Sequence, residues 1–300
     1  MGQHDKSHKI LQANNDVFAD IFNVLLFKGE EVIKEDSLFE ASASSVFMDE
    51  KGKLREQFRD VSKYWGNTEV RIALCGIENQ TSIDPDMPLR LFSYDGSAYK
   101  QQLIDEPNKS GQRYPVITIV LYFGSVPWER YRTLYDTFAE FPERLRPHVN
   151  NYKANVYEIS FLSDKTVNLF NSDFRFIAEY FTQIHKKQEY KPSARDIRHP
   201  YPVFNFLAKA TGEQFFEYAA KLPMPQTGGV KMTNIMDRLL NEGMEKGMEK
   251  GMEKGLLRGQ FETLIKLVNQ NIITVKQAAE QLGMSVAKFK STAKKLALTI

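Results

Sequence analysis

The sequence predicts an α/β domain, with a mixed central sheet flanked by helices, followed by an all-α extension at the C-terminal end. Strand-like apolar runs and amphipathic helical segments alternate through the first 225 residues, which is the pattern of a sheet covered by helices. Beyond them the chain carries a low-complexity tract and then helical segments alone. We therefore divide the sequence into a domain over 1–225, a linker of helical character over 226–255 and a small helical domain over 256–300.

The composition is that of an ordinary globular protein. Hydrophobic residues make up 42% of the 300 positions and charged residues 26%, as in typical soluble domains. The sequence offers no apolar run long enough to span a bilayer and no signal peptide. Its single cysteine, Cys75, excludes a disulfide framework and a thiolate zinc site within one chain. We expect a cytoplasmic protein with no membrane contact and no organic cofactor.

The first domain begins with a helix and a hairpin. Residues 13–27 have helical apolar spacing, which places Asp16, Asp20 and Asn23 on one stripe of that helix. Residues 58–64 and 69–80 have strand character, and the Gly66-Asn67 turn signal between them indicates a β-hairpin.

The later elements of this domain follow from period and composition. Residues 86–103 are expected to be helical, and 114–123 form an almost wholly apolar run typical of a central strand. Residues 155–162 predict a weaker strand, and 172–189 and 202–222 are helical by period and length.

Two carboxylates are expected at one end of this sheet. Alternation along the second hairpin strand continues an apolar face into Glu78 and then Gln80. Asp60 lies near the beginning of the partner strand, and antiparallel pairing brings that beginning close to the end of the other strand. Pairing of residues 60 and 78 centres the hairpin near 69, whereas the turn signal centres it earlier, so a bulge or a longer turn must absorb the difference.

These residue types suit a hard cation. The carboxylates of Asp60 and Glu78, with the backbone carbonyl of Asn79 between Glu78 and Gln80, form an oxygen ligand set for Mg²⁺ or Mn²⁺. Such an ion polarises a phosphate and activates water, and Gln80 would orient that water. An ordinary solvated hairpin edge is the alternative interpretation of the same residues.

Four motifs in this order resemble the Rpn/YhgA-like family of recombination-promoting nucleases, often labelled as transposases, in the PD-(D/E)XK superfamily. The resemblance extends over about residues 4–225. The motifs are Arg59-Asp60-Val61, Gly76-Ile77-Glu78-Asn79-Gln80-Thr81, Met87-Pro88-Leu89-Arg90 with Tyr94, and Tyr114-Pro115-Val116-Ile117 through Leu121-Tyr122-Phe123-Gly124.

The resemblance implies a restriction-endonuclease-like core and a bacterial, Mg²⁺- or Mn²⁺-dependent DNA endonuclease that acts at the nucleoid in recombination or mobile DNA. Asp60 and Glu78 match the acidic residues of the superfamily, and Gln80 stands where a lysine is usual. Asp20 matches a further acidic position, with a solvated helix position as its alternative. Arg90 and Tyr94, at i and i+4, are candidates for contact with the phosphate, with support of the core as the alternative for Tyr94. A non-catalytic DNA-binding or transposon accessory protein with this fold is the alternative function.

The last third of the chain has a different character. Gly-Met-Glu-Lys occurs three times in tandem over 243–254, and each glycine weakens a helix by about 1 kcal/mol relative to alanine. A flexible tether and a helix that packs on the body or joins a homo-oligomer remain alternatives.

The tail adds three short helical segments, over 256–269, 275–282 and 285–296. The last two resemble a helix-turn-helix with Ser285 as N-cap. Four lysines of the last segment are candidate DNA contacts, and a helical cap or oligomerisation module is the alternative. They are Lys288, Lys290, Lys294 and Lys295.

Overall fold

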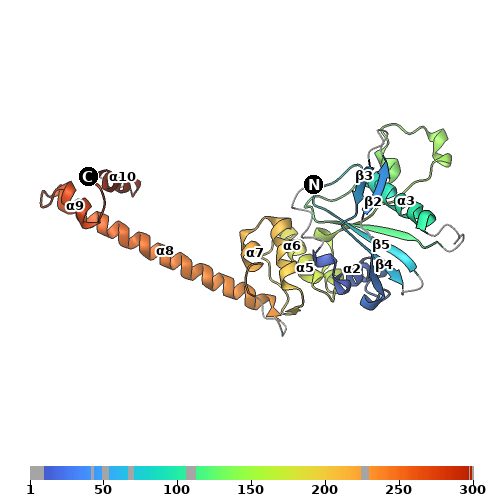
Figure 1. The fold of residues 1–300 in the computed structure, drawn as a ribbon, viewed down its shortest axis with the longest axis horizontal. Helices are drawn as coiled ribbons and strands as arrows, with labels where there is room; N and C mark the ends of the chain where they lie inside the picture. Colours follow the sequence, from blue (N-terminus) through green and yellow to red (C-terminus); the bar gives the residue numbers. More distant parts are fainter. Residues whose placement is uncertain are drawn as a thin grey trace. The chain divides into compact units, whose positions relative to one another are not determined.

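The computed structural model of the protein describes residues 10–41, 44–48, 54–66, 71–105, 113–223, 230–296 and 298. The chain divides into two compact units, Met1–Ile235 and Met236–Ile300. Figure 1 shows the succession of elements along the chain. Within the described ranges, no helix combines the length and the apolar character needed to cross a membrane.

A five-stranded mixed sheet forms the centre of the first unit, in the order β1-β4-β5-β6-β7. β1 pairs antiparallel with β4 and β4 antiparallel with β5, whereas β5, β6 and β7 run parallel. The sheet confirms the predicted α/β class with its mixed central sheet. Its strands are β1 (Leu38–Glu40), β4 (Val61–Gly66), β5 (Arg71–Gln80), β6 (Val116–Tyr122) and β7 (Asn155–Glu158).

Two smaller sheets accompany it. β2 (Ser44–Met48) pairs with β3 (Leu54–Phe58), and β8 (Asp196–Ile197) pairs with β9 (Val230–Lys231). The predicted strand over 58–64 is therefore wrong at its start, because Phe58 ends β3 of a separate sheet and β4 of the central sheet begins only at Val61. The strand conformation is interrupted at residues 59–60, where the side chain of Arg59 turns into the core and is 2% exposed.

The register of the central hairpin brings Asp60, the residue before β4, to the end of β5. Val61 pairs with Ile77 and Ser62 with Gly76, and the register shifts between Trp65 and Gly66. The irregularity shifts the register by one residue, which is less than the offset between the two predicted centres of the hairpin. The predicted turn at Asn67 and the start of the second strand at 69–70 lie outside the described residues.

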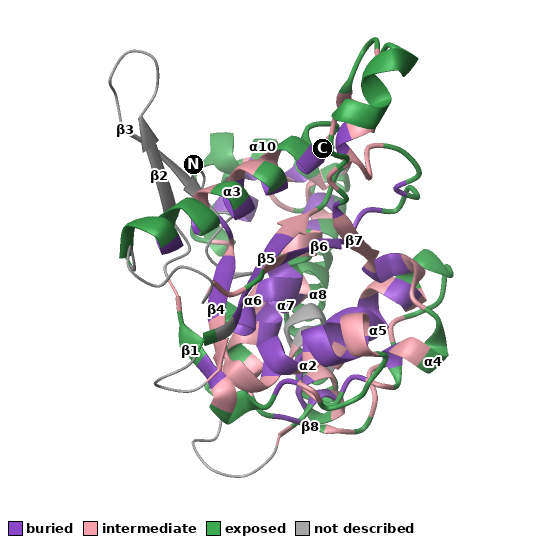
Figure 2. Cartoon of the chain, turned by 90° about the vertical axis from the view of Figure 1, so that its right-hand side faces the viewer, coloured by how far each residue is buried: buried purple, intermediate pink, exposed green. Residues whose placement is uncertain are grey.

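Helices cover both faces of the sheet (Figure 2). On one face of β5, Leu74, Gly76 and Glu78 are directed towards α3 (Met87–Asp105), and on the other Cys75 is completely buried. Lys63, the partner of Cys75 across β4 and β5, has its ammonium 5.9 Å from the ring of Phe18 in α2. Side chains along β5 thus alternate between two faces of the sheet as predicted, and both faces are buried.

The other helices of the first unit lie mainly after the sheet in sequence. They are α2 (Asn15–Phe27), α4 (Asp164–Val167), α5 (Phe174–His185), α6 (Pro200–Thr211) and α7 (Gln214–Ala219), with 3-10 turns at Glu35–Ser37, Leu134–Thr137, Glu143–His148 and Ile159–Phe161. The single helix expected over 202–222 is wrong, because Gly212 adopts a left-handed φ of 72° and ends α6. The strand expected over 155–162 likewise gives way to a 3-10 turn after Glu158.

A buried ion pair joins the sheet to α3. Arg59 donates from Nη2 to Asp95 Oδ1 at 2.7 Å and from Nε to Thr118 Oγ1 at 3.1 Å. Asp95 also accepts hydrogen bonds from Thr118 Oγ1 at 2.6 Å and from the hydroxyl of Tyr152 at 2.5 Å. Charges removed from water are tolerated when they are paired and hydrogen-bonded in this way.

The second unit is helical. α8 (Met232–Asn269) supplies Phe261, which stacks on Phe289 of α10 (Val286–Lys295) with ring centroids 4.8 Å apart. α9 (Val275–Gln281) lies between them in sequence, and its N-cap Thr274 forms a capping box with Gln277. Ser285 caps α10 as predicted, and the C-terminal helical region agrees with the expected all-α extension.

Gly76 should be intolerant of substitution. A Cβ at this position would lie 2.6 Å from Cδ of Arg59, so Gly76→Ala should displace the guanidinium and break its pair with Asp95. We expect a loss of about 3 kcal/mol or more in the free energy of unfolding, measured by denaturant titration.

Gly96→Ala is the matched control, because nothing lies within 4 Å of a Cβ built at Gly96 in α3. Removing a glycine from a helix interior should raise stability by up to about 1 kcal/mol. Equal stabilities of the two variants would show that the Arg59 pair does not constrain the fold.

Candidate active site

Asp60 lies at the point where β4 begins. Its backbone N–H donates to the carbonyl of Ile77 at 3.1 Å, and its carboxylate Oδ2 accepts from the backbone N–H of Asn79 at 2.8 Å. The ladder between the two strands is thus continued for one more bond by a side chain. The Asp60 carboxylate is therefore fixed at the edge of the sheet where β5 extends past β4.

The amide of Asn79 holds this carboxylate from a second direction. Its Nδ2 donates to Asp60 Oδ2 at 2.9 Å and to Oε1 of the fully buried Gln12 at 2.8 Å, and Gln12 Nε2 donates back to Asn79 Oδ1 at 2.7 Å. Backbone N–H and C=O of one strand residue point to the same side. The carbonyl of Asn79 therefore points to the side on which Asp60 stands.

Glu78 projects from the opposite face of β5, towards α3, and is only 4% exposed. A carboxylate this buried needs charge compensation, and Arg90 Nη2 provides it through an ion pair with Glu78 Oε1. Gln80, two residues further on the same face, donates from Nε2 to the same oxygen at 3.3 Å. The sequence pattern predicted the common face but gave no sign of this ion pair.

Arg90 connects this carboxylate to the beginning of α3. Its Nη1 donates to Asp84 Oδ2 at 2.6 Å and its Nη2 to the hydroxyl of Tyr94 at 3.2 Å. Burial alone would lower the pKa of Arg90, but the charge of Glu78 and the bonds to Tyr94 and Asp84 raise it, so the guanidinium stays charged. It is 36% exposed, and can therefore also meet a ligand from solvent.

The hydroxyl of Tyr94 is influenced by the charges of both carboxylates, Glu78 and Asp60. Burial raises the pKa of Tyr94, and the charges of Glu78 and Asp60 raise it further, against hydrogen bonding and attraction by Arg90. Its hydroxyl therefore remains protonated near neutral pH and can donate a hydrogen bond. Hydrogen bonds thus join four of the residues predicted from the sequence, Glu78, Gln80, Arg90 and Tyr94. The negative charge of Asp60 also raises the pKa of Tyr94.

The donor set fits a small hard cation. Carboxylate oxygens and a backbone carbonyl are the ligands that Mg²⁺ and Mn²⁺ prefer. Asp60 and the carbonyl of Asn79 lie at the edge of the sheet, and Glu78 lies on the face of β5 towards α3. Within the described ranges, no three His, Cys, Asp or Glu side chains gather around a single position. Protein coordination here would accordingly use two carboxylates, as is usual for Mg²⁺.

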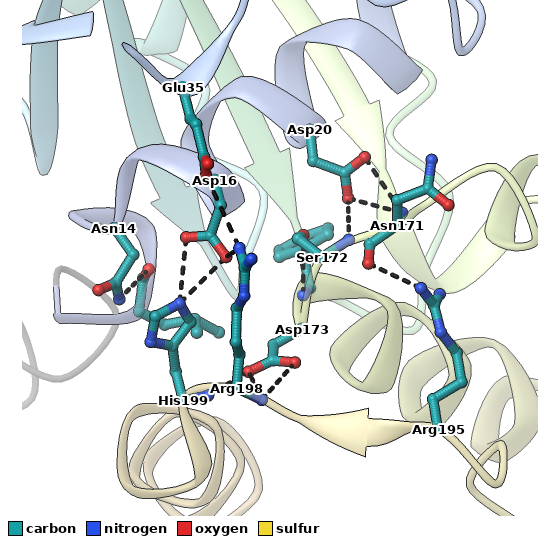
Figure 3. A network of polar contacts seen from close by, with 12 residues as sticks. Asn14, Asp16, Asp20, Glu35, Asn171, Ser172, Asp173, Arg195, Arg198 and His199 are labelled. Carbon is teal, nitrogen blue, oxygen red and sulfur yellow. Dashed lines mark hydrogen bonds and ion pairs between the residues drawn. The ribbon is translucent and has the colours of Figure 1, made fainter. Parts of the chain in front are cut away.

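Asp20 belongs to a different polar network, on the stripe of α2 that it shares with Asp16 and Asn23. Its Oδ2 accepts from the backbone N–H groups of Asn171 at 2.9 Å and Ser172 at 2.7 Å (Figure 3). Burial nevertheless raises the pKa of Asp20. The stripe lines a cavity of about 950 Å³ whose wall is completed by the segments around residues 29–36, 169–173 and 196–200.

Asp16 forms the second half of that network. Its carboxylate contacts Nε2 of His199 at 3.1 Å and Nη1 of Arg198 at 3.0 Å, and Asp173 accepts the backbone N–H of Arg198 at 2.9 Å (Figure 3). Burial would raise the pKa of Asp16, but the hydrogen bonds from His199 and Arg198 lower it to about 2. Sequence reasoning missed this partnership, because 183 residues separate Asp16 from His199.

The lysines of the tail lie in the second unit. All four are exposed on or at the end of α10, whose other side buries Phe289 and Ala293 against α8 and α9. They are Lys288, Lys290, Lys294 and Lys295. Their placement agrees equally with contact to a phosphate backbone and with a solvated helix face.

A family match covers the part of the chain that contains the carboxylates. The sequence profile of the family described as "Putative transposase, YhgA-like" matches residues 3–196, which is more than half of the chain. The chain belongs to this family. Its description connects this YhgA-like chain with mobile DNA. The matched span contains Asp60, Glu78, Gln80 and Arg90, whereas the tail lies beyond it.

No curated protein and no solved structure matches the chain.

The Asp16–His199 pair should make the stability of this YhgA-like protein depend on pH. A hydrogen bond to Asp16 raises the pKa of His199, so the contribution of the pair is complete below the unfolded value near 6.5 and is lost as the pH rises through the folded value. The lowered pKa of Asp16 removes the same contribution at acid pH, towards 2. We expect about 0.5–1 kcal/mol, as the pair is partly exposed.

The measurement is urea unfolding of wild type and Asp16→Asn at pH 5.5 and pH 8.5. Wild type should lose more stability than the variant between these pH values. Asp36→Asn, a change at an exposed carboxylate of the same cavity, should behave like wild type. If Asp16→Asn retained the wild-type pH dependence, the pair would not be responsible for it.

Proposed function

We propose that this protein is a metal-dependent DNA endonuclease that hydrolyses phosphodiester bonds in the recombination or movement of DNA. The observation that carries the proposal is the position of Asp60 at the end of β5, where its carboxylate accepts the N–H of Asn79, the residue next to Glu78. Family membership supports a DNA-related role. The resemblance of the motifs to the PD-(D/E)XK superfamily adds the expectation of hydrolysis.

Asp60 and Glu78 would hold Mg²⁺ or Mn²⁺, with the carbonyl of Asn79 as a third oxygen. When bound, the ion would supply Lewis-acid polarisation of the scissile phosphate and a lowered pKa for water. Asp20 is left out of this centre, because its carboxylate is engaged by the backbone of residues 171–172.

Arg90 supplies the positive charge that Gln80 cannot. A neutral amide at position 80 orients water or a phosphate oxygen but stabilises no developing negative charge. The guanidinium of Arg90 shares Glu78 Oε1 with Gln80, so a fixed cation stands next to that amide. Its planar fork suits bidentate contact with a phosphate, and the protonated hydroxyl of Tyr94 adds a further donor.

The exposed lysines of α10 would add sequence-independent contacts to the DNA backbone. Such contacts give affinity and salt dependence without base recognition. A non-catalytic DNA-binding protein with the same fold remains the second candidate, favoured by the neutral Gln80 where a lysine is usual.

Replacing either carboxylate by its amide should abolish cleavage. Asp60→Asn retains an oxygen that can accept the N–H of Asn79, and Glu78→Gln leaves Arg90 paired with Asp84, so both variants should fold. We expect metal-dependent plasmid nicking to fall by about 10²-fold or more, measured beside the thermal unfolding midpoint.

Asp86→Asn is the control, an exposed carboxylate at the beginning of the same helix. It should nick at the wild-type rate. Wild-type nicking by Asp60→Asn or Glu78→Gln would remove these residues from the site. Salt-sensitive DNA retention by wild type without any cleavage would establish the non-catalytic alternative.

Arg90 and Gln80 should be partly interchangeable as carriers of charge. We expect Arg90→Gln to lower the nicking rate by about 10²-fold, because the site then lacks its cation. Adding Gln80→Lys should restore a substantial part of that rate, because it places an ammonium beside Glu78. Glu78→Gln should not be rescued by the same lysine. A double variant no faster than Arg90→Gln would show that Arg90 acts by packing.

A further inference from the structure

The turn between α9 and α10 is tightly defined. Gly283 takes a left-handed φ of 63° and donates to the carbonyl of Glu280 at 2.9 Å, and the N–H of Met284 donates to the carbonyl of Ala279 at 3.0 Å. These two bonds close α9 in a Schellman motif. Ser285 follows at once as the N-cap of α10. The connection is therefore too short for the angle between the two helices to vary freely.

The end of α8 supports both helices. Phe261 stacks on Phe289 of α10 with ring centroids 4.8 Å apart, and Ala278 and Ala279 of α9 are buried in the same apolar cluster. Two helices joined by a short turn that contains glycine are the arrangement of a helix-turn-helix. Here a third helix holds the pair, so α10 has one fixed side and one side that faces solvent.

Small side chains occupy the middle of the solvent side of α10. Ala287 and Ser291 lie about one turn apart, and both are exposed. Successive residues are about 100° apart around a helix, so this pair lies roughly opposite the buried side chains of Phe289 and Ala293. Another surface can therefore approach the helix backbone closely along this row.

Lysines stand on both borders of the row. The same helical spacing places Lys290 and Lys294 on one side of it and Lys288 and Lys295 on the other. All four are exposed, and α10 contains no acidic residue. The face thus has a low, nearly uncharged middle between two cationic edges.

This charge pattern is unfavourable for a helix that meets only water. Arg258 of α8 is paired with Glu262, one turn further along. In α10 the residue one turn beyond Lys290 is another lysine, Lys294, and like charges at this spacing repel. Lys288 lies in the first turn, where the helix dipole disfavours a cation. A polyanion lying along α10 would remove both penalties.

We propose that α9 and α10 form a helix-turn-helix that places α10 in the major groove of double-stranded DNA. This groove is about 12 Å wide and admits an α-helix. The lysines of the two borders would contact the phosphates on either side, and Ala287 and Ser291 would face the base edges between them. The assignment rests on the proposed function for DNA as the partner, but not on cleavage.

The two small side chains would make the contact depend on sequence. A methyl group such as that of Ala287 packs on the methyl group of thymine, and a serine hydroxyl can donate to a base edge or accept from it. Ala287 and Ser291 are about 6 Å apart along the helix, close to two base pairs at about 3.4 Å each. We therefore expect a preferred sequence, in addition to the sequence-independent contacts that the lysines provide.

Selection from random duplexes about two turns of DNA long tests base recognition in the full-length chain. EDTA in the binding buffer prevents metal-dependent cleavage during the selection. By fluorescence anisotropy, the enriched duplex should bind roughly tenfold or more tightly than a scrambled duplex, the effect of one or two base contacts. The separated strands of the enriched duplex should bind no better than scrambled strands, because single strands have no major groove.

Bulk in the middle of the face should remove the preference alone. Ser291→Leu lifts α10 from the base edges but keeps every lysine, so the enriched duplex should fall to the affinity of the scrambled one. Lys288→Gln with Lys294→Gln should weaken both duplexes and lower the log–log salt slope by about one unit per phosphate contact removed. Gln260→Leu, at an exposed position of α8, is the matched control and should bind both duplexes as wild type does.

Absence of any enriched sequence would overturn the proposal, as would a preference that Ser291→Leu leaves intact. Circular dichroism checks that this variant keeps its helices, since leucine favours helix more than serine. Plasmid nicking without an enriched sequence would leave the endonuclease standing and remove base recognition by α10. An enriched sequence without nicking would do the reverse.

Discussion

The buried pair of Arg59 and Asp95 is the interaction on which the first unit depends. Arg59 reaches the core because β3 and β4 are interrupted at residues 59–60, and it occupies the space that only a glycine at position 76 leaves open. Asp95 then fixes the middle of α3 over the sheet. A purely apolar contact would permit sliding of the helix, whereas a buried ion pair held by further hydrogen bonds from Thr118 and Tyr152 defines one position.

The position of α3 fixed by Asp95 also sets the position of Arg90, which lies about one and a half turns earlier in the same helix. Arg90 reaches Glu78 only if α3 lies over β5 at this height, so the structural pair and the candidate catalytic pair are linked through one rigid helix. Interruption of the strands at 59–60 serves both, since Arg59 turns inward to hold the helix and Asp60 turns to the edge of the sheet. The interruption between β3 and β4 thus supplies both the residue that holds α3, Arg59, and one carboxylate of the candidate site, Asp60.

Local pattern predicted the parts of the structure that depend on neighbours in sequence. Alternation along β5 located Glu78 and Gln80 on one face, where the amide of Gln80 donates to the carboxylate of Glu78. Contacts between residues far apart in the sequence could not be predicted from the local pattern. Arg59 has the sequence context of an ordinary strand residue, and no local pattern connects Asp16 with His199. Such pairs depend on the packing of distant segments, which produces no periodicity in the sequence.

The carboxylate of Asp60 has two competing uses, because it replaces a main-chain carbonyl in the ladder by accepting the N–H of Asn79. Any cation that draws this carboxylate away must leave that N–H to water or to another acceptor. In the proposed metal site, a cation that took Oδ2 of Asp60 would compete with this hydrogen bond and loosen the end of β5. Cation affinity and order at this edge of the sheet would then oppose each other through one oxygen atom.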